Sequence, residues 1–463
     1  MRDLGEIVLV ACYELGHQPL AVAWPAAALE RAGYAPALMD VAVEPFDAER
    51  VRRARLVAIS VPMHTALRLG ATVAARVRET NPAAHVCLYG LYAGLNADHL
   101  LAHGADSVIA GEVEASLVAL AQSLEAGGGT GVRGVGRPGM PAPPVLERLP
   151  LPVPTRTTLP PLGKYARLER DGRLELAGYV EASRGCLHHC RHCPIPPVYG
   201  GRFFAVPRDV VLADIRQLVE AGARHITFGD PDFLNGPTHA LRIAREVHAA
   251  FAGLTFDFTA KVEHLVRHER HLAEFAALGC VFVVTAVESL SDRVLSILDK
   301  GHTRADVGRA LRATRAAGLA LRPTWVPFTP WTTLDDYREM LGFIATEGLV
   351  DHVDPVQYGI RLLVPPGSLL VEHPEMSPHL GELVADAFHW RWTHPDPRMD
   401  ALSDRVSALV AEAAERREDP ALTFSRVRTV AGEAAGVPPA AETVVAAAAN
   451  RARPPRLTEP WFC

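Results

Sequence analysis

Cysteine is scarce in this chain, with seven residues among 463. A secreted scaffold held together by disulfides is shorter and much richer in cysteine, so that class of protein is excluded. Basic charge is not in surplus either, because the formal net charge at pH 7 is −6. General nucleic-acid binders and binders of anionic membranes carry a basic surplus or patch. We therefore expect no nucleic-acid partner and no membrane partner.

Long apolar runs are also missing, since none approaches the roughly 18–20 residues that a membrane helix needs. The chain opens Met1-Arg2-Asp3-Leu4-Gly5-Glu6, with acids where an export signal has bases. These absences, together with cysteines suited to a reducing compartment, predict a cytoplasmic protein. A hydrophobic content of 49% and a charged content of 22% are typical of a folded chain, and the length predicts two or three domains.

Residues 1–125 alternate short β-branched runs with amphipathic helical stretches. This alternation predicts an α/β domain with a flavodoxin-like, doubly wound parallel sheet. The expected strands cover residues 7–11, 37–41, 56–60, 85–89 and 107–110.

A segment rich in glycine and proline follows, and it predicts an irregular linker over residues 126–173. The β–α alternation then resumes over residues 174–371, which predicts a partial (β/α) barrel with its chemistry at the C-terminal ends of the strands. We expect residues 372–463 to form a mainly helical C-terminal region with a proline-rich tail. The expected barrel strands cover residues 176–182, 225–228, 256–261, 281–287, 321–326 and 356–358.

Three cysteines share the loop that follows the first expected barrel strand. Cys186, Cys190 and Cys193 are spaced C-x3-C-x2-C. Complete electron-transfer iron–sulfur clusters take four cysteines. Three thiolates can hold a 4Fe-4S cluster and leave one iron open to bind a further molecule. The alternative is a structural zinc site, which needs four ligands, commonly from two separated pairs. No second cysteine pair follows here, although His188, His189 or His192 could complete a zinc site.

The spacing resembles the signature of radical S-adenosylmethionine (SAM) enzymes, and the resemblance extends over most of residues 175–370. It implies that the open iron chelates SAM and that one electron from the cluster releases a 5′-deoxyadenosyl radical. It also implies an external low-potential flavodoxin or ferredoxin as the electron donor. On this reading Cys186, Cys190 and Cys193 are both the metal ligands and the catalytic residues.

The same resemblance implies contacts to SAM at the end of the second barrel strand. The segment there reads Phe228-Gly229-Asp230-Pro231-Asp232-Phe233. An acidic side chain or a backbone group at this place receives the SAM amino group in the family. A carboxylate suits a bound ammonium group. Asp230 is the first candidate and Asp232 the second, with Gly229 beside them.

Three further residues match places that contact SAM in the family. Glu288, in the segment Val287-Glu288-Ser289-Leu290 after the fourth strand, is expected to contact SAM. Lys261, on the third strand, is expected to pair with the SAM carboxylate. His192 stands before the third cysteine, where relatives are usually aromatic, and its ring is expected to stack on adenine.

The N-terminal domain resembles the cobalamin-binding-type domain that precedes many radical SAM barrels. Ser60 and Gly90 match the places, after the third and fourth strands, near which the cofactor's nucleotide tail is held. The usual D-x-H-x-x-G loop is absent, and His17 stands in that loop within a different pattern. A cobalamin domain and a cofactor-free scaffold both stay open, because fold does not fix function.

The end of the chain, Glu459-Pro460-Trp461-Phe462-Cys463, resembles the beginning of the tail of CUAEP/CCAEP-tail radical SAM (seleno)proteins. This resemblance implies that the protein continues past Cys463 through selenocysteine or cysteine. The function we expect is cobalamin-assisted methylation, or a related radical modification, of a small molecule. The alternatives are a cobalamin-independent radical enzyme that uses such a tail and a non-catalytic iron–sulfur or zinc protein.

Overall fold

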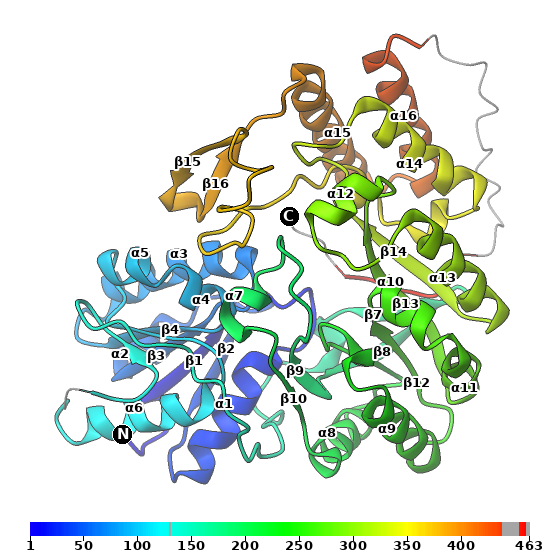
Figure 1. Cartoon of the computed structure of the whole chain (residues 1–463). Coiled ribbons are helices and arrows are strands. Elements are labelled where there is room, and N and C mark those ends of the chain that lie inside the picture. The colour runs from blue at the N-terminus through cyan, green and yellow to red at the C-terminus, as the bar shows by residue number, and fades with distance from the viewer. Residues whose placement is uncertain (129–130, 438–452, 460–463) are drawn as a thin grey trace.

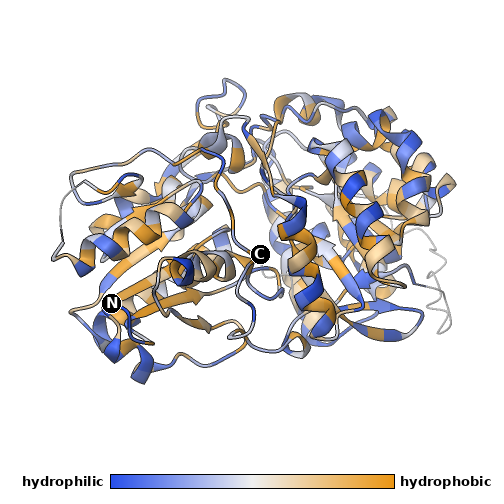
Figure 2. Cartoon of the chain, turned by 90° about the horizontal axis from the view of Figure 1, so that it is seen from below, coloured by the Kyte–Doolittle hydropathy of each residue, from blue (hydrophilic) through white to orange (hydrophobic). Residues whose placement is uncertain are grey.

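The computed structural model describes residues 1–128, 131–437 and 453–459 and arranges them as two α/β units side by side (Figure 1). A helical region covers one end of the second unit, and a β-hairpin reaches from it toward the first. Within the described residues no helix is long and apolar enough to cross a membrane. Hydrophobic residues concentrate on the strands and on the helix faces turned toward them, while the outer helix faces are hydrophilic (Figure 2).

A six-stranded sheet in the order β2-β1-β3-β4-β5-β6 forms the centre of the first unit. Strands β1 to β5 are parallel, and β6 pairs antiparallel with β5. Side chains alternate across β1, so Ile7 and Leu9 pack with α1 and α6, while Val8 and Val10 pack with α2 and α3. The predicted doubly wound sheet is therefore confirmed. Its elements are β1 (Ile7–Ala11), α1 (Leu20–Arg31), β2 (Ala37–Asp40), α2 (Ala48–Arg53), β3 (Leu56–Ser60), α3 (His64–Thr80), β4 (His85–Tyr89), α4 (Leu91–Leu95), α5 (Ala97–Ala102), β5 (Ser107–Ile109), α6 (Glu114–Glu125) and β6 (Val135–Gly136).

The second unit is a half-barrel built on five parallel strands, β8, β11, β12, β13 and β14. Two antiparallel strands, β7 and β17, extend its edge beyond β8. The partial barrel expected from the sequence is thus present. Its elements are β7 (Arg167–Arg170), β8 (Arg173–Val180), β9 (Ser183–Gly185), α7 (Ile195–Tyr199), β10 (Phe203–Ala205), α8 (Arg208–Glu220), β11 (His225–Phe228), α9 (Pro237–Ala250), β12 (Thr255–Thr259), α10 (Val262–Arg267), α11 (Leu272–Ala277), β13 (Cys280–Glu288), α12 (Asp292–Ile297), α13 (Arg304–Ala316), β14 (Ala320–Trp325), α14 (Leu334–Thr346) and β17 (Arg456–Leu457).

The prediction of a sixth barrel strand at residues 356–358 was wrong. These residues belong to a 3₁₀ helix, η5 (Pro355–Tyr358). Pro355 has no backbone N–H to contribute to a strand ladder. The edge of β14 is instead paired by a side chain, since the Trp325 backbone N–H donates to Gln357 Oε1 at 2.9 Å.

The C-terminal region is helical only from Pro397, so the expectation of a mainly helical segment from residue 372 was wrong over its first part. An antiparallel hairpin of β15 (Leu380–Val384) and β16 (His389–Trp392) precedes α15 (Pro397–Glu415) and α16 (Pro420–Ala434). This hairpin reaches the helices of the first unit (Figure 1).

The turn of the hairpin is anchored in the core of the first unit. Phe388 is 3% exposed and packs into the hydrophobic core that contains β1 and α3. Its ring meets the His99 ring edge-on at 5.2 Å, and His64 Nε2 lies 2.9 Å from the Ala387 carbonyl oxygen. Phe388 has φ +59°, a conformation that bulky residues rarely adopt, so the tertiary contact holds it there.

Replacement of Phe388 by alanine is expected to destabilise the folded chain by about 3–5 kcal/mol, since it empties a buried aromatic site. The thermal unfolding midpoint should fall, and limited proteolysis should cut the hairpin first. Leu383→Ala, at a residue of the same hairpin that is 39% exposed, is the matched control. Equal midpoints for the two variants would contradict the anchoring role.

Candidate functional site

The cysteine loop lies between β9 and α7, at the C-terminal ends of the half-barrel strands. Gly185 opens the loop with φ +74°, and a Cβ there would meet the Arg202 carbonyl oxygen at 2.3 Å, so only glycine fits. Cys186 and Cys190 are buried, and Cys193 is partly buried. Burial raises the pKa of the Cys186 thiol, and burial with the two neighbouring thiols raises the pKa of Cys193 to about 12.

The spacing of the sulfur atoms argues against a zinc site. Ligands of one zinc ion, with Zn–S bonds of about 2.3 Å, lie within about 4 Å of each other. In the described part of the chain, the sets of three ligand atoms that fall within 4.8 Å of one another do not include the cysteine trio. As they stand, the three thiols are therefore not close enough together to share a single zinc ion, whereas a 4Fe-4S cluster takes each thiolate on a different iron.

Two neighbours of the loop also suit an iron–sulfur cluster. Asn235 Oδ1 accepts from the Leu187 backbone N–H at 3.4 Å, while its buried Nδ2 has no hydrogen-bond partner among the described residues. The Lys300 ammonium group is 3% exposed and lies close enough to Cys190 and Cys193 to interact with their charge. A free donor and a buried cation match the negative charge that a thiolate-bound cluster carries.

Glu288 lies in a buried ion pair at the end of β13. Its Oε1 is 3.2 Å from Lys300 Nζ and 3.2 Å from His192 Nε2. Burial opposes ionisation, yet Lys300 and His192 lower the pKa of Glu288 to about 2. The structure thus brings together two residues predicted to contact SAM, Glu288 and His192 of the cysteine loop, and pairs Lys300 with the same Glu288 carboxylate.

Asp230 is 2% exposed and supports the segment that leads into the cysteine loop. Its Oδ2 accepts from the Ala182 backbone N–H at 2.9 Å, and its Oδ1 accepts from the Ser183 hydroxyl. Burial raises the pKa of Asp230 to about 7, although both hydrogen bonds oppose the rise. The neighbouring Gly229 is packed so closely that a Cβ would overlap the Tyr179 ring at 2.0 Å.

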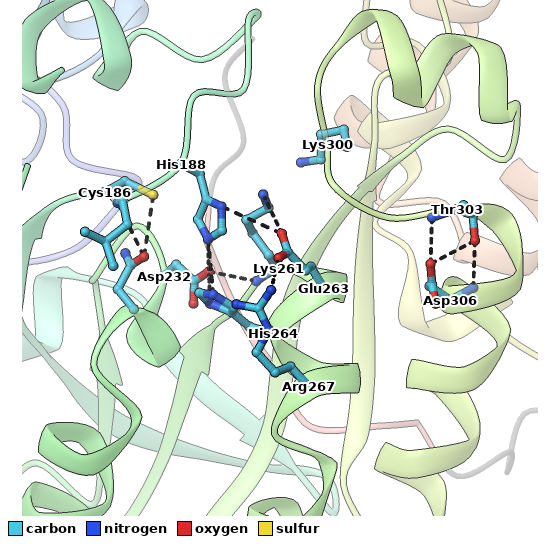
Figure 3. Close-up of polar contacts among 12 residues, drawn as sticks. Cys186, His188, Asp232, Lys261, Glu263, His264, Arg267, Lys300, Thr303 and Asp306 are labelled. Atoms are coloured by element: carbon cyan, nitrogen blue, oxygen red, sulfur yellow. Dashed lines mark hydrogen bonds and ion pairs between the residues drawn. The ribbon is translucent and has the colours of Figure 1, made fainter. Parts of the chain in front are cut away.

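Asp232 and Lys261, the other predicted SAM contacts, lie together beneath the loop (Figure 3). Asp232 accepts from the Leu234 backbone N–H at 3.0 Å and from the Lys261 backbone N–H at 3.3 Å. Lys261 is 8% exposed, and its Nζ lies 3.4 Å from Glu263 Oε2. Both side chains therefore already have partners within the protein.

In the first unit, the residues that match cobalamin-contact positions stand at the C-terminal ends of adjacent strands. Ser60 ends β3, and its buried hydroxyl makes no well-aligned hydrogen bond within the described residues. Gly90 follows β4 with φ +113°, and a Cβ there would press on the Val61 backbone at 3.3 Å. A buried hydroxyl without a well-aligned hydrogen bond and a backbone position that only glycine fits are both compatible with a cofactor bound at this edge of the sheet. His17 is engaged elsewhere, since its ring stacks on Tyr179 at 4.6 Å and its Nε2 lies 3.0 Å from Glu459 Oε1.

The two units meet around Arg184, the residue before the loop glycine. Its guanidinium group donates to Glu112 at 2.8 Å and to Glu114 at 2.6 Å, both in the first unit. It also lies over the Trp24 ring, 4.2 Å from the centroid. A second link is Tyr92 of α4, which lies near Cys193. Burial, together with the smaller effect of Cys193, raises the pKa of the Tyr92 hydroxyl.

Glu181 precedes the loop and lies near the charged groups of Arg184, Glu112 and Glu114. Burial raises its pKa to about 8; Arg184 opposes this rise and Asp230 adds to it. Because the unfolded chain releases this proton near pH 4.5, the contribution of Glu181 to stability is lost as the pH rises from about 4.5 through 8.

Glu181→Gln is expected to unfold like the wild type near pH 4.5 and at a higher temperature than the wild type at pH 8.5. Thermal unfolding of the apoprotein across this range, followed by circular dichroism, measures the difference. Glu175→Gln, on the preceding strand β8, is the control. If the difference in thermal midpoint between the wild type and Glu181→Gln did not grow with pH, the raised pKa of Glu181 would be contradicted.

Sequence reasoning missed three residues of this site, namely Lys300, Arg184 and Asn235. A signal for Lys300 was present, because the chain has only three lysines, Lys164, Lys261 and Lys300. Nothing in the local sequence marks Arg184 or Asn235, whose partners lie 48 to 72 residues away.

Comparison with known families matches both units. The model of the radical SAM superfamily matches residues 180–341, and the model of the B12 binding domain matches residues 6–121. Among curated proteins, a tRNA-2-methylthio-N(6)-dimethylallyladenosine synthase of Pseudomonas fluorescens (strain Pf0-1) is 24% identical over 229 residues, covering 47% of this chain and 51% of that protein. The synthase of Haemophilus influenzae (strain PittEE) is 25% identical over 206 residues, 41% of this chain and 42% of that protein. The chain thus spans about half the length of these relatives, or less.

Solved structures share the fold over more of the chain. The cobalamin-dependent S-adenosylmethionine radical enzyme OxsB, with aqua-cobalamin and S-adenosylmethionine bound, has a TM-score of 0.70 at 15% identity, over 89% of this chain and 67% of that one. The radical S-adenosylmethionine methyltransferase TsrM from Kitasatospora setae has a TM-score of 0.61 at 20% identity, over 74% and 71%. The chain thus joins a domain that matches the radical SAM superfamily to a domain that matches the B12 binding domain, which supports an enzyme that uses a 4Fe-4S cluster and SAM together with cobalamin.

Proposed function

We propose that this enzyme uses cobalamin and SAM to methylate, or to modify by a related radical reaction, a small molecule. The contact between the two units carries the proposal. The elements that flank the cysteine loop pack against the C-terminal edge of the B12-binding sheet, β9 through Arg184 to Glu112 and Glu114 and α7 through Tyr199 Oη to Glu112 at 3.0 Å. The residues proposed to hold the two cofactors would therefore lie on the two sides of one junction.

Cys186, Cys190 and Cys193 would hold three irons of the cluster, and Ser60 and Gly90 would border cobalamin. When bound, the cluster supplies an electron to SAM, and cobalamin is a carrier of methyl groups. The protein contributes binding, orientation and electrostatics to such chemistry.

The predicted SAM contacts acquire specific tasks in this proposal. Asp230 shapes the backbone that leads into the loop and stays a predicted contact to the SAM amino group. Glu288 acts through Lys300, which it keeps charged and fixed beside the cysteines. The His192 ring and the Lys261 ammonium group stay as predicted contacts to adenine and to the SAM carboxylate.

A small molecule is favoured as the substrate over RNA. The chain has a net charge of −6, whereas an RNA-binding surface is normally basic. The curated relatives named for a tRNA product match about half of their length. The electron donor we expect is a low-potential flavodoxin or ferredoxin.

Anaerobic reconstitution with iron, sulfide and cobalamin tests the proposal. The reduced enzyme, given methyl-deuterated SAM and a panel of small molecules, should form 5′-deoxyadenosine or S-adenosylhomocysteine and transfer label to one substrate. Mass spectrometry reads all three products. Turnover of SAM that proceeds equally well without cobalamin would favour the cobalamin-independent alternative. Absence of any SAM turnover by a loaded cluster would favour a non-catalytic iron–sulfur protein.

Membership of the CUAEP/CCAEP-tail group is a further part of the proposal. It rests on the resemblance of the chain end, and residues 460–463 lie outside the described residues. Sequencing the gene beyond Cys463 tests it, since a UGA codon followed by codons for alanine, glutamate and proline is expected.

A further inference from the structure

Two histidines and an aspartate converge beside the cysteine loop, in an arrangement to which the proposed function gives no task (Figure 3). His188 comes from the loop itself, Asp232 from the segment after β11, and His264 from α10. His188 Nε2 lies 3.2 Å from His264 Nε2 and 4.0 Å from Asp232 Oδ2, and His264 Nδ1 lies 2.8 Å from Asp232 Oδ2.

Hydrogen bonding alone leaves this group incomplete. His264 is 4% exposed, and its Nδ1 has no hydrogen-bond partner among the described residues, because the short approach to Asp232 is not aligned for one. A buried polar atom without a partner is costly and calls for a ligand. Two ligand atoms that each lie about 2.1 Å from one ion are about 3.0–3.4 Å apart in octahedral or tetrahedral geometry. One imidazole can give only one of its two nitrogens to an ion, and with one atom taken from each residue the three candidate ligand atoms lie within 4.8 Å of one another, so small side-chain shifts would bring them onto one ion.

The outer surroundings resemble those of a metal site. A ligating imidazole usually donates its other ring nitrogen to a carboxylate, and a ligating carboxylate is itself hydrogen-bonded. His188 Nδ1 has such a carboxylate nearby, with Glu263 Oε2 at 3.8 Å, which is beyond hydrogen-bond distance, and Glu263 is held by Lys261 and Arg267. Asp232 is fixed by two backbone N–H groups, as described above.

We propose that His188, Asp232 and His264 bind a divalent first-row transition metal ion, distinct from the iron–sulfur cluster. Two imidazoles and one carboxylate suit zinc or ferrous iron and leave positions open for a substrate oxygen or nitrogen. Lys261 and Arg267 both pair with Glu263, which offsets part of their positive charge. The ion would tie the cysteine loop to the ends of β11 and β12.

The described residues contain one other set of this kind, His99, His103 and Asp386. Asp386 is 93% exposed in its side chain and His103 is exposed, so this set lacks the enclosed ligands of the first. It can still take up added metal. The test is therefore made in a His103→Ala background, which removes it.

Zinc is the probe. The reconstituted enzyme, with four irons per chain, is equilibrated with Zn²⁺ and desalted, and both metals are counted by mass spectrometry. We expect about one zinc per chain, and at least a tenfold loss of zinc in His264→Ala and in Asp232→Asn with iron unchanged. His271→Ala, a nearby histidine outside the group, should keep its zinc.

X-ray absorption at the zinc edge then identifies the ligands. Nitrogen and oxygen at about 2.0–2.1 Å are expected, whereas sulfur at about 2.3 Å would place the zinc on the cysteines. The proposal is overturned by sulfur ligation, by zinc retention in both variants, or by no zinc in the parent enzyme. None of these readouts requires turnover, so they are independent of the proposed methylation.

Discussion

Replacement of Cys186 by alanine is expected to reduce formation of 5′-deoxyadenosine from SAM by at least about 100-fold, since even outer-shell partners of a metal site contribute 10–100-fold. The loop supplies three thiolates, so losing one leaves two ligands for a cluster that already has an open iron. The iron content after reconstitution should fall together with the activity. Product is measured by chromatography, and iron and sulfide are counted per chain.

Cys280→Ala is the matched control for this prediction. Cys280 is also a buried cysteine of the second unit, but it lies at the start of β13, and its Sγ contacts the Phe282 carbonyl oxygen at 3.3 Å. This variant should keep four irons per chain and its activity. If Cys186→Ala kept both as well, the assignment of the loop as the cluster site would be wrong.

Lys300→Met should destabilise the chain by about 3–5 kcal/mol, the usual cost of breaking a buried ion pair by removing one partner. Glu288 would be left as a buried carboxylate with only His192 nearby. For a domain of this size such a loss lowers the thermal midpoint by roughly 10 °C. Calorimetry or circular dichroism of the apoprotein measures it.

A double variant separates lost charge compensation from lost packing. Lys300→Met combined with Glu288→Gln removes both charges. This double variant should regain most of the fall in thermal midpoint that Lys300→Met causes alone. Lys164→Met, whose side chain is 45% exposed and paired with Glu44, should unfold like the wild type. If Lys300→Met behaved like Lys164→Met, the ion pair would have no structural importance.

Much of the fold was accessible from local patterns. Strands such as β3 and β4 are short apolar runs buried on both faces, and they lie at the residues expected from sequence. The cysteine loop was equally accessible, because its three cysteines fall within eight residues and their spacing alone limits the clusters they could hold. These features depend on neighbouring residues, so the sequence by itself determined them.

Only the tertiary structure decided how distant segments combine. The turn between β15 and β16 is anchored because Phe388 packs into a core that lies about 280 to 380 residues earlier in the chain, and residues 356–358 form part of a 3₁₀ helix whose Gln357 side chain pairs with Trp325. Glu288 faces Lys300, and His188 meets Asp232 and His264, only because parallel strands bring their C-terminal ends to one edge. Burial at that edge then sets which carboxylates ionise, and no local pattern carries that information.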